Sequence, residues 1–178
     1  MTHAPTVLVL ASGKGERFIA SGGTGSKLQA LVAGRPVIEH TLAAVRASGL
    51  PWHVEQAQHP GMGDSIAAAV RATRDAKGWL VLPADLPLIR PESLQAVAAA
   101  LAGHPVVVPF HRGQRAHPVG FDARFRDALL ALSGAEGAAA IVRANAPLRL
   151  ELDDPGIVTD IDTLQDLQRA EVLLRSAG

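Results

Sequence analysis

The chain has 178 residues, of which 48% are hydrophobic and 19% charged, a composition typical of a folded globular chain. Lys plus Arg and Asp plus Glu balance at 17 each, so the net charge gives no sign of a nucleic-acid or membrane-surface partner. The absence of cysteine excludes disulfides, thiolate nucleophiles and cysteine-based zinc sites. No apolar run approaches the roughly 20 residues that span a bilayer. We therefore expect one cytoplasmic domain over residues 1–178.

The first half of the chain alternates aliphatic runs with helical patterns. Val7–Leu10 is a continuous aliphatic run, which is typical of a strand buried on both faces. A glycine-rich loop over 12–28 follows, and Pro36 then opens a helix that Gly49 ends. The pattern further predicts a weak strand at Trp52–Ala57, a turn at 61–63, a helix at Ile66–Arg74 capped by Asp64 or Ser65, and a buried strand at Trp79–Leu82 that Pro83 ends.

The second half continues the alternation. Pro91 begins a helix with an apolar stripe at 94, 97 and 101. The pattern then predicts strands at Pro105–Phe110 and Pro118–Phe121, helices at Asp122–Leu132 and Ala135–Ala144, short strands at Leu148–Leu152 and Ile157–Asp160, and a last helix at Thr163–Ser176 with a Thr163-x-x-Asp166 capping box. Strands alternating with helices predict a mostly parallel α/β sheet, whose ligands bind beyond the carboxyl ends of the strands.

The loop from Ser12 to Lys27 is the first candidate binding segment. Its glycines let backbone N–H groups turn toward a phosphate, and Arg17 and Lys27 supply positive charge. It matches neither the dinucleotide fingerprint, because Phe18 replaces the third glycine, nor the Walker pattern, because Ser26 separates Gly25 from Lys27. The alternative is a long flexible connection, but loops of this length are uncommon unless they are functional.

Asp85 is the second candidate, since it directly follows a buried strand and is flanked by Pro83 and Pro87. A fixed carboxylate in a nucleotide site commonly holds Mg²⁺, which prefers oxygen ligands. The alternative is a turn aspartate that bonds its own backbone. The scattered histidines, His3, His40, His53, His59 and His104, show no metal-ligand spacing, and we expect them to be surface or core residues.

These residues resemble a known family. Val9–Phe18 with Lys27 is similar to the L-A-[AG]-G-x-[GS]-x-R-[FM]…K signature of nucleotidyltransferases, and Leu82–Pro87 to their L-x-x-D-x-P segment. Three further segments, 61–66, 113–119 and 160–163, resemble the G-M-x-x-S-[LI], G-x-R-G-H-P and D-[IV]-D-T-P motifs of one branch. That branch comprises the molybdenum-cofactor cytidylyltransferases and their MobA-like relatives. The resemblance implies a three-layer α/β/α fold with a Rossmann-like sheet of the nucleotide-diphospho-sugar transferase type.

The resemblance also implies roles for individual residues. Arg17, Lys27 and Asp85 would be catalytic, and Arg115 and His117 would face the acceptor. Asp85 and Asp162 would bind Mg²⁺, with Asp160 as the alternate ligand. The nucleotide would lie against Leu10, Ala11, Ser12, Gly13, Gly15, Arg17, Lys27, Gly61, Met62 and Ser65. On the sequence alone, Asp162 is equally well a residue that favours the start of the next helix, and His117 an ordinary loop histidine.

The implied reaction moves a nucleoside monophosphate from CTP or GTP to a phosphate-bearing acceptor, with molybdopterin as the implied acceptor and a molybdoenzyme or chaperone as an implied contact. Ser12 favours CTP over GTP, because the guanylyl-transferring relatives carry glycine there. Two alternatives stay open: a sugar-phosphate nucleotidyltransferase, and a nucleotide-binding module without transfer activity.

The chain also departs from the family pattern. Only Leu50–Pro60 connects the first long helix to the glycine turn, so one strand–helix unit is absent and the sheet should be narrower at that edge. Ile19–Ser26 is inserted before Lys27, and Ala116 replaces a glycine. The G-D-x-G-A-R segment becomes 134–139, with alanine in place of its acid and its arginine.

Overall fold

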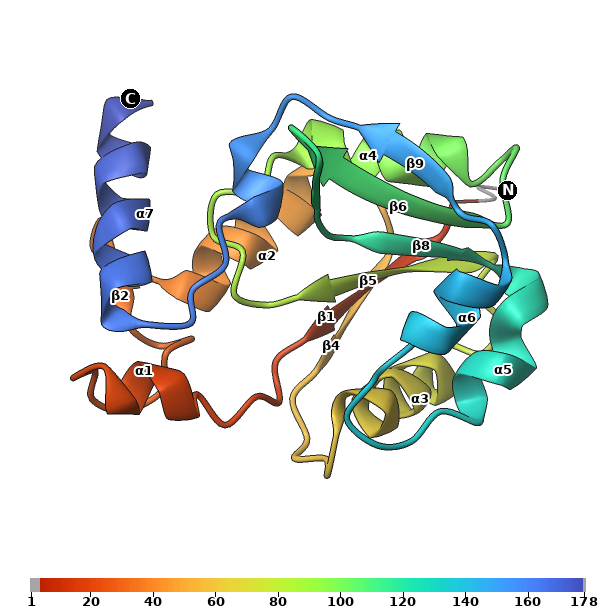
Figure 1. The fold of residues 1–178 in the computed structure, drawn as a ribbon, viewed down its shortest axis with the longest axis horizontal. Coiled ribbons are helices and arrows are strands. Elements are labelled where there is room, and N and C mark those ends of the chain that lie inside the picture. Colours follow the sequence, from red (N-terminus) through yellow and green to blue (C-terminus); the bar gives the residue numbers. More distant parts are fainter. Residues whose placement is uncertain (1–3, 178) are drawn as a thin grey trace.

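A mostly parallel sheet forms the centre of the protein, in a computed structural model that describes residues 4–177 (Figure 1). Three strands at one side of the sheet run parallel, and β8 is antiparallel to both of its neighbours, β5 and β6. The sheet has seven strands, in the order β4 (Trp52–Glu55), β1 (Thr6–Leu10), β5 (Gly78–Pro83), β8 (Val119–Asp122), β6 (Val106–His111) and β7 (Gln114–Arg115), with β9 (Leu148–Glu151) pairing parallel to β6.

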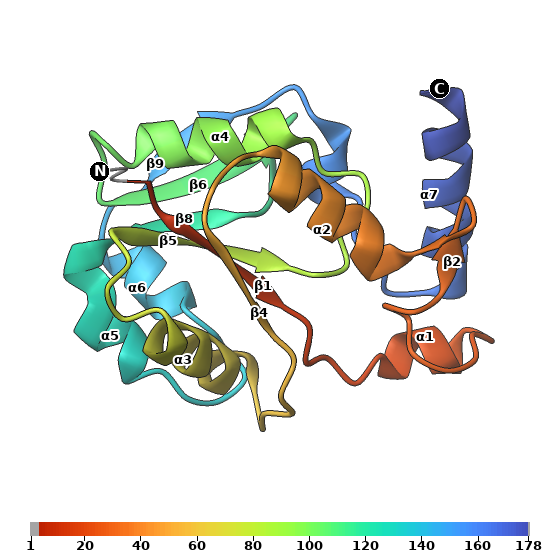
Figure 2. The same ribbon diagram turned by 180° about the vertical axis from the view of Figure 1, so that it is seen from behind.

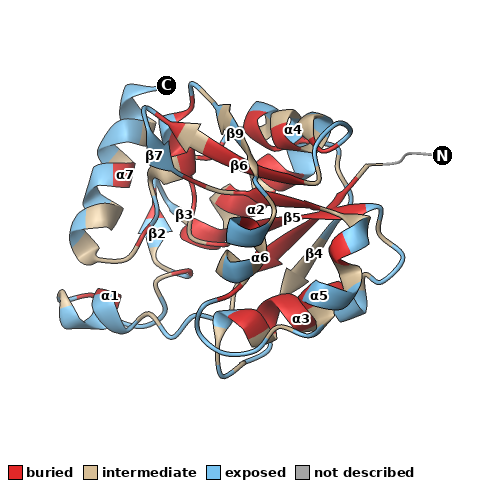
Figure 3. Ribbon diagram, turned by 45° about the vertical axis from the view of Figure 1, so that its right-hand side comes forward, coloured by how far each residue is buried: buried red, intermediate tan, exposed pale blue. Residues whose placement is uncertain are grey.

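Each face of the sheet packs against its own set of helices. Val7 and Val9 of β1 belong to a core with α2 (Val37–Ala47) and α4 (Pro91–Ala100), whereas Leu8 and Leu10 belong to a second core. The second core contains side chains of α3 (Met62–Ala72), α5 (Arg126–Leu130) and α6 (Ala139–Ala144). Figures 1 and 2 show these helices above and below the strands, and Figure 3 shows that the buried residues lie toward the sheet. The predicted three-layer α/β/α architecture is confirmed.

The glycine-rich segment and the C-terminal helix form one flank of the molecule (Figure 1). This flank contains α1 (Glu16–Ala20), the hairpin of β2 (Leu31–Val32) and β3 (Arg35–Pro36), and α7 (Leu164–Ser176). Leu164 N donates to Ser21 Oγ over 2.8 Å, and Ala33 N donates to Glu171 Oε1 over 3.2 Å. These bonds tie α7 to the glycine-rich segment and to the β2–β3 hairpin. Within 4–177 we find no helix with the length and apolar character that a membrane crossing requires.

Several predicted element boundaries are wrong, and local hydrogen bonds explain why. Helix α3 begins at Met62 and not at Ile66, because Asp64 and Ser65 bond other segments instead of capping the helix. Residues Ile157–Asp160 do not form a strand: Asp154 caps a 3₁₀ turn over Pro155–Val158. Helix α6 begins at Ala139 and not at Ala135, since Gly134 and Gly137 adopt left-handed φ values of 81° and 61°.

The predicted narrowing of the sheet is confirmed. A single strand, β4, lies between α2 and α3, and among the described strands it pairs with β1 alone. The chain then passes from β4 directly to α3, across 56–61. The capping box at the start of α7 is also as predicted, because the Thr163 side chain accepts from Asp166 N and the Asp166 carboxylate accepts from Thr163 N.

Gly156 provides a test of this packing, because a Cβ at this position would collide with the backbone of Leu88 and Ile89. We expect Gly156→Ala to lower the free energy of unfolding by about 1–3 kcal/mol, which is roughly 2–4 °C in Tm per kcal/mol for a chain of this size. Gly103→Ala is the control, since no atom lies within 4 Å of its added Cβ. Equal Tm values for the two variants in a calorimetric scan would contradict this packing.

Candidate active site

A cleft of about 660 Å³ opens at the carboxyl ends of β1 and β5. The glycine-rich loop, the turn before α3, the end of β5, and the segments 114–117 and 157–162 line it. The predicted site residues found in its lining are Leu10, Ser12, Gly13, Gly15, Arg17, Lys27, Gly61, Met62, Ser65, Asp85, Arg115, His117, Asp160 and Asp162. Ala11 does not line the cleft: its N–H donates to the Glu55 carbonyl of β4, and its side chain packs against the core.

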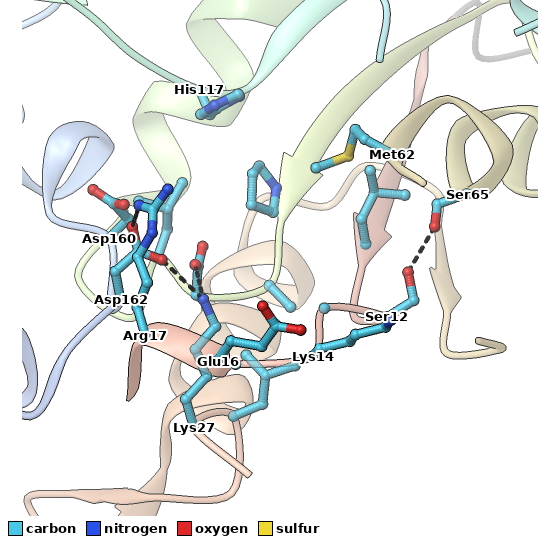
Figure 4. A pocket seen from close by; sticks show the side chains of 18 of the residues that line it. Ser12, Lys14, Glu16, Arg17, Lys27, Met62, Ser65, His117, Asp160 and Asp162 are labelled. Carbon is cyan, nitrogen blue, oxygen red and sulfur yellow. Dashed lines mark hydrogen bonds and ion pairs between the residues drawn. The ribbon is translucent and has the colours of Figure 1, made fainter. Parts of the chain in front are cut away.

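An ionic cluster at one end of the cleft joins three distant parts of the chain. Lys27 Nζ donates to Asp85 Oδ2 over 2.8 Å and to Asp162 Oδ1 over 3.2 Å. Arg17, with a side chain 80% exposed, reaches the other oxygen of Asp162 over 3.2 Å. Figure 4 shows Arg17, Lys27, Asp160 and Asp162 gathered on the same side of the cleft. The predicted phosphate cations and metal ligands are therefore neighbours.

Backbone hydrogen bonds hold Asp85 in place. Ala84 N donates to the Leu10 carbonyl over 3.0 Å, which couples the residue before Asp85 to the end of β1. The Ala84 carbonyl accepts from Thr41 Oγ1 of α2 over 2.7 Å, and the Asp85 carbonyl accepts from Ile161 N over 3.0 Å. Because Asp85 and Ile161 are bonded directly, Asp85 and Asp162 are kept at a short separation. The alternative was that the Asp85 carboxylate bonds the backbone of its own turn. Among the described residues its carboxylate bonds Lys27, and no bond to its own turn is present.

The carboxylates form a group suited to a divalent cation. One oxygen each of Asp85, Asp160 and Asp162 lies within 4.8 Å of the other two. Burial raises the pKa of Asp160, and the neighbouring carboxylates of Asp85 and Asp162 raise it further. Burial alone would lower the pKa of Lys27, but the carboxylates of Asp85 and Asp162 outweigh burial and raise it. The contributions of Asp85 and Asp162 to both shifts reflect the negative charge gathered at this end of the cleft. Carboxylate oxygens are the ligands that Mg²⁺ and Mn²⁺ accept.

The opposite end of the cleft is built from small residues and hydroxyls. Ser12 Oγ and Ser65 Oγ are hydrogen-bonded at 2.6 Å, which joins the glycine-rich loop to α3 (Figure 4). Nearer the ionic cluster, Gly15 adopts a left-handed φ of 64° at the start of α1, beside the Lys27 side chain. Gly61 leaves no room for a Cβ, because the Gly134 carbonyl lies against it. The glycines therefore let backbone segments approach one another as well as line the cleft.

His117 and Arg115 lie beyond the ionic cluster. Arg115 is exposed in β7, whereas His117 Nδ1 is buried and has no hydrogen-bond partner among residues 4–177. Burial lowers the pKa of His117, with the nearby Asp85 opposing this shift and Arg115 adding to it. The imidazole is therefore neutral at neutral pH. A buried nitrogen without a partner in the protein is suited to a hydrogen bond with a ligand.

His59 also lines the cleft, and the sequence prediction of a surface or core residue missed it. Its Nε2 lies 3.2 Å from Glu55 Oε1, and His53 Nε2 lies 3.4 Å from the other oxygen of this carboxylate. The two histidines lower the pKa of Glu55 against the opposing effect of its burial. Nothing in the local pattern of residues 53–59 indicates this placement, because it depends on β4 being the edge strand.

The comparisons with known proteins agree with this geometry. The model of the MobA-like NTP transferase domain family matches residues 7–150. The bifunctional protein GlmU of Alkalilimnicola ehrlichii is 34% identical over 125 residues, which cover 58% of this chain and 26% of GlmU. The 2-C-methyl-D-erythritol 4-phosphate cytidylyltransferase of Frankia casuarinae is 36% identical over 125 residues, covering 57% of this chain and 46% of the enzyme. The chain thus spans less than half the length of these relatives.

Solved structures show the same fold. Rv0371c from Mycobacterium tuberculosis superimposes with a TM-score of 0.80 at 20% identity, covering 97% of this chain and all of that one. A manganese complex of Rv0371c superimposes with a TM-score of 0.74 at 19% identity, covering 95% and 98% of the two chains. At such identities the likeness concerns the fold alone. The family match, over most of the chain, is the stronger finding: the protein belongs to the MobA-like NTP transferase domain family.

Lys27 gives the first test of the site. We expect Lys27→Met to weaken the binding of a nucleoside triphosphate about 10- to 100-fold, because a charged hydrogen bond contributes roughly 1.5–3 kcal/mol. Isothermal titration calorimetry with CTP and MgCl₂ measures the change. Lys77→Met, at an exposed lysine in the turn before β5, is the matched control and should leave the affinity unchanged. An unaltered Kd for the Lys27 variant would remove this lysine from the site.

Proposed function

We propose that the protein transfers CMP from CTP to a phosphate-bearing acceptor, with Mg²⁺ as the metal, and releases pyrophosphate. The observation that carries this proposal is the ammonium of Lys27 placed between the carboxylates of Asp85 and Asp162, beside a glycine-rich loop. A phosphate-binding cation and two metal-binding acids at one point suit a metal–triphosphate complex.

The triphosphate would lie along the loop of residues 12–15, whose backbone is open to the cleft. No atom lies within 4 Å of a Cβ built on Gly13, so a phosphate can approach the backbone there. Lys27 and the exposed Arg17 would turn from the carboxylates to the phosphates. This exchange needs a cation to take the place of Lys27, because the freed carboxylates would otherwise repel the triphosphate.

Asp85 and Asp162 would hold the metal ion, and Asp160 lies close enough to join them. When bound, a divalent cation neutralises charge on the phosphate oxygens and favours the departure of pyrophosphate. The manganese complex of Rv0371c supports a divalent cation in this fold. Three neighbouring carboxylates, two of them bonded to one ammonium, support the same conclusion from the chain's own residues.

The reaction requires no general base. An oxygen of the acceptor phosphate attacks the α-phosphorus of CTP, a new P–O–P link forms, and the bond to pyrophosphate breaks. A phosphate monoester has a second pKa near 6, so at neutral pH it is largely a dianion and ready to attack. Catalysis then depends on positioning and on the neutralisation of charge by Lys27, Arg17 and the metal ligands. This accounts for a cleft that holds acids and cations without a serine–histidine pair.

The acceptor would approach from the side of Arg115 and His117. The resemblance to molybdenum-cofactor cytidylyltransferases makes a pterin-type phosphate the first acceptor to test. The similarity to a 2-C-methyl-D-erythritol 4-phosphate cytidylyltransferase makes a phosphorylated polyol or sugar the second. The substitutions at 134–139 weigh against the pterin. The alternative function is that of a nucleotide-binding module without transfer activity. An enzyme releases pyrophosphate when an acceptor is added, whereas such a module does not.

Asp85 is the residue that tests the metal. Asp85→Asn removes one of the charges that hold the cation, so we expect transfer to fall about 100-fold or more and CTP affinity to become insensitive to EDTA. Asp162→Asn should have the same effect more weakly, since Asp160 can substitute for it. Pyrophosphate release and calorimetry, each with and without MgCl₂, measure the two effects.

The control for both variants is Asp153→Asn, which alters an exposed aspartate outside the cleft lining. It should retain the turnover and the Mg²⁺ dependence of the original protein. If Asp85→Asn also retains full Mg²⁺-dependent turnover, then Asp85 is a structural partner of Lys27 and the proposed metal site is wrong.

The base preference is tested at Ser12. Its side chain, bonded to Ser65, occupies space that a glycine would leave open to a larger purine ring. We expect CTP to bind about 10-fold more tightly than GTP, and Ser12→Gly to narrow this difference. Competition of the two nucleotides for the Mg²⁺-loaded protein measures the ratio. A protein that prefers GTP would contradict the assignment of CMP as the transferred group.

A further inference from the structure

A second cavity, of about 160 Å³, adjoins the cleft. The two share the side chains of Leu10, Met62, Pro83, Arg115 and His117, so they are neighbours across one set of residues. From there the second cavity extends between the sheet and the helices α3 and α6. Figure 4 shows Met62 on the side of the cleft away from Arg17 and Asp162, with His117 at the top of the view between the two sides.

The walls of this cavity are mainly apolar. Its inner lining consists of Ile66, Val81, Val119, Phe121, Gly137, Ala138, Ala139 and Val142. Three polar groups accompany them: Arg115 and Glu136, both exposed, and the buried Nδ1 of His117, which lacks a partner among the described residues. A ligand that entered would thus meet one buried hydrogen-bonding atom, mainly hydrocarbon walls, and two exposed charged side chains.

Residues 136–139 form one wall of the cavity, and they belong to the segment 134–139, which departs from the family pattern. Ala139 stands where that pattern has an arginine, and Ala135 where it has an acid. A long charged side chain at 139 would project from the first turn of α6, at a position that lines the cavity. Alanine leaves this space open and uncharged.

The wall is also held firmly in place. Gly63 N donates to the Gly134 carbonyl over 2.8 Å, and Gly134 N donates to Asp64 Oδ2 over 3.0 Å. Gly137, at a left-handed φ of 61°, packs directly against the Met62 side chain. These contacts connect the segment to the start of α3, so the cavity and the cleft are positioned by the same residues.

We propose that this cavity receives the body of the acceptor, and that the acceptor is a phosphate monoester of a small, mainly apolar alcohol. This inference rests on the proposed transfer function. A dry apolar cavity of roughly 150 Å³ holds one benzene molecule, so the body is about the size of a single six-membered ring. Its phosphate lies in the shared region near Arg115 and His117, between the cavity and the loop that would carry the triphosphate.

The polar groups of other acceptors fit this cavity poorly. A sugar carries several hydroxyls and a pterin several ring nitrogens and amines, and each loses its water on entering. His117 Nδ1 can satisfy one such group, and the exposed Arg115 and Glu136 can bond others only at the solvent side. The groups that face the apolar lining are left without partners, which costs affinity. A fused pterin also exceeds the space that holds one ring. The neutral state of the buried imidazole is compatible with a single hydrogen bond to an ester or hydroxyl oxygen.

Synthetic acceptors test the inference directly. Benzyl phosphate, cyclohexyl phosphate, glucose 1-phosphate and a pterin phosphate are each supplied with CTP and MgCl₂, and pyrophosphate release is followed. We expect kcat/KM at least about 10-fold higher for the two apolar esters than for the sugar and pterin phosphates. A higher value for either polar acceptor overturns the inference but leaves the transfer function intact.

A variant that fills the cavity supplies the second arm. Ala139→Leu should lower kcat/KM for benzyl phosphate about 10-fold or more, with the Kd of CTP and the Tm close to those of the original protein. Ala99→Leu, at an exposed alanine of α4, is the matched control and should leave kcat/KM for benzyl phosphate, the Kd of CTP and the Tm unchanged. Undiminished use of benzyl phosphate by Ala139→Leu overturns the cavity assignment. Failure of the original protein to bind CTP with Mg²⁺ overturns the proposed function, and with it the inference.

Discussion

The ionic cluster around Lys27 is the interaction on which the cleft depends. Asp85 and Asp162 come from segments far apart in the sequence, and like charges at such separation repel unless a cation lies between them. The ammonium of Lys27 supplies that charge, with side chains of Lys27 and Asp85 that are each only 14% exposed. Partly buried ion pairs are weak evidence for stability, so the arrangement is better explained by the ligand that would replace these contacts.

The scaffold around the cluster is arranged to keep the acids close. Backbone bonds run from β1 to Ala84 and from Asp85 to Ile161, and the capping box of α7 fixes the residues that follow. None of these bonds involves the carboxylates of Asp85 and Asp162. The acids and the lysine can therefore change partners while the backbone stays in place, which is what binding of a metal–triphosphate complex requires.

The cleft and its neighbouring cavity differ in chemistry. The cleft has cations and acids at one end, suited to phosphate and metal, whereas the cavity beyond His117 is walled by hydrocarbon. The start of α3 serves both, because Met62 lines each of them and Gly61 and Gly63 pack on the 133–135 backbone. A reaction between a triphosphate and a compact ester needs such a division, with the two phosphates meeting where the regions adjoin.

The sequence by itself determined the class of fold and indicated which residues would line the candidate site. Aliphatic runs followed by helical patterns predict a parallel sheet, and the carboxyl ends of its strands indicated where Lys27, Asp85 and Asp162 would meet. Predictions from such local patterns hold in the folded chain because they depend on backbone preferences and on the burial of one face of a helix or strand. The capping box of Thr163 and Asp166 is such a signal, since both of its partners lie within one turn.

Only the tertiary structure decided what depends on contacts between distant segments. Asp64 looked like a helix cap, but it bonds Gly134, and the helix begins at Met62, four residues before the predicted start at Ile66. His59 lines the cleft because the chain passes from the edge strand straight to α3. Ala11 does not line the cleft, because its N–H donates to the Glu55 carbonyl of β4. The apolar cavity has no sequence signature at all, since its lining comes from β1, α3, β5, β7, β8 and α6. Local pattern records which residues prefer a helix or a strand, whereas a cavity arises only where packed elements leave space between them.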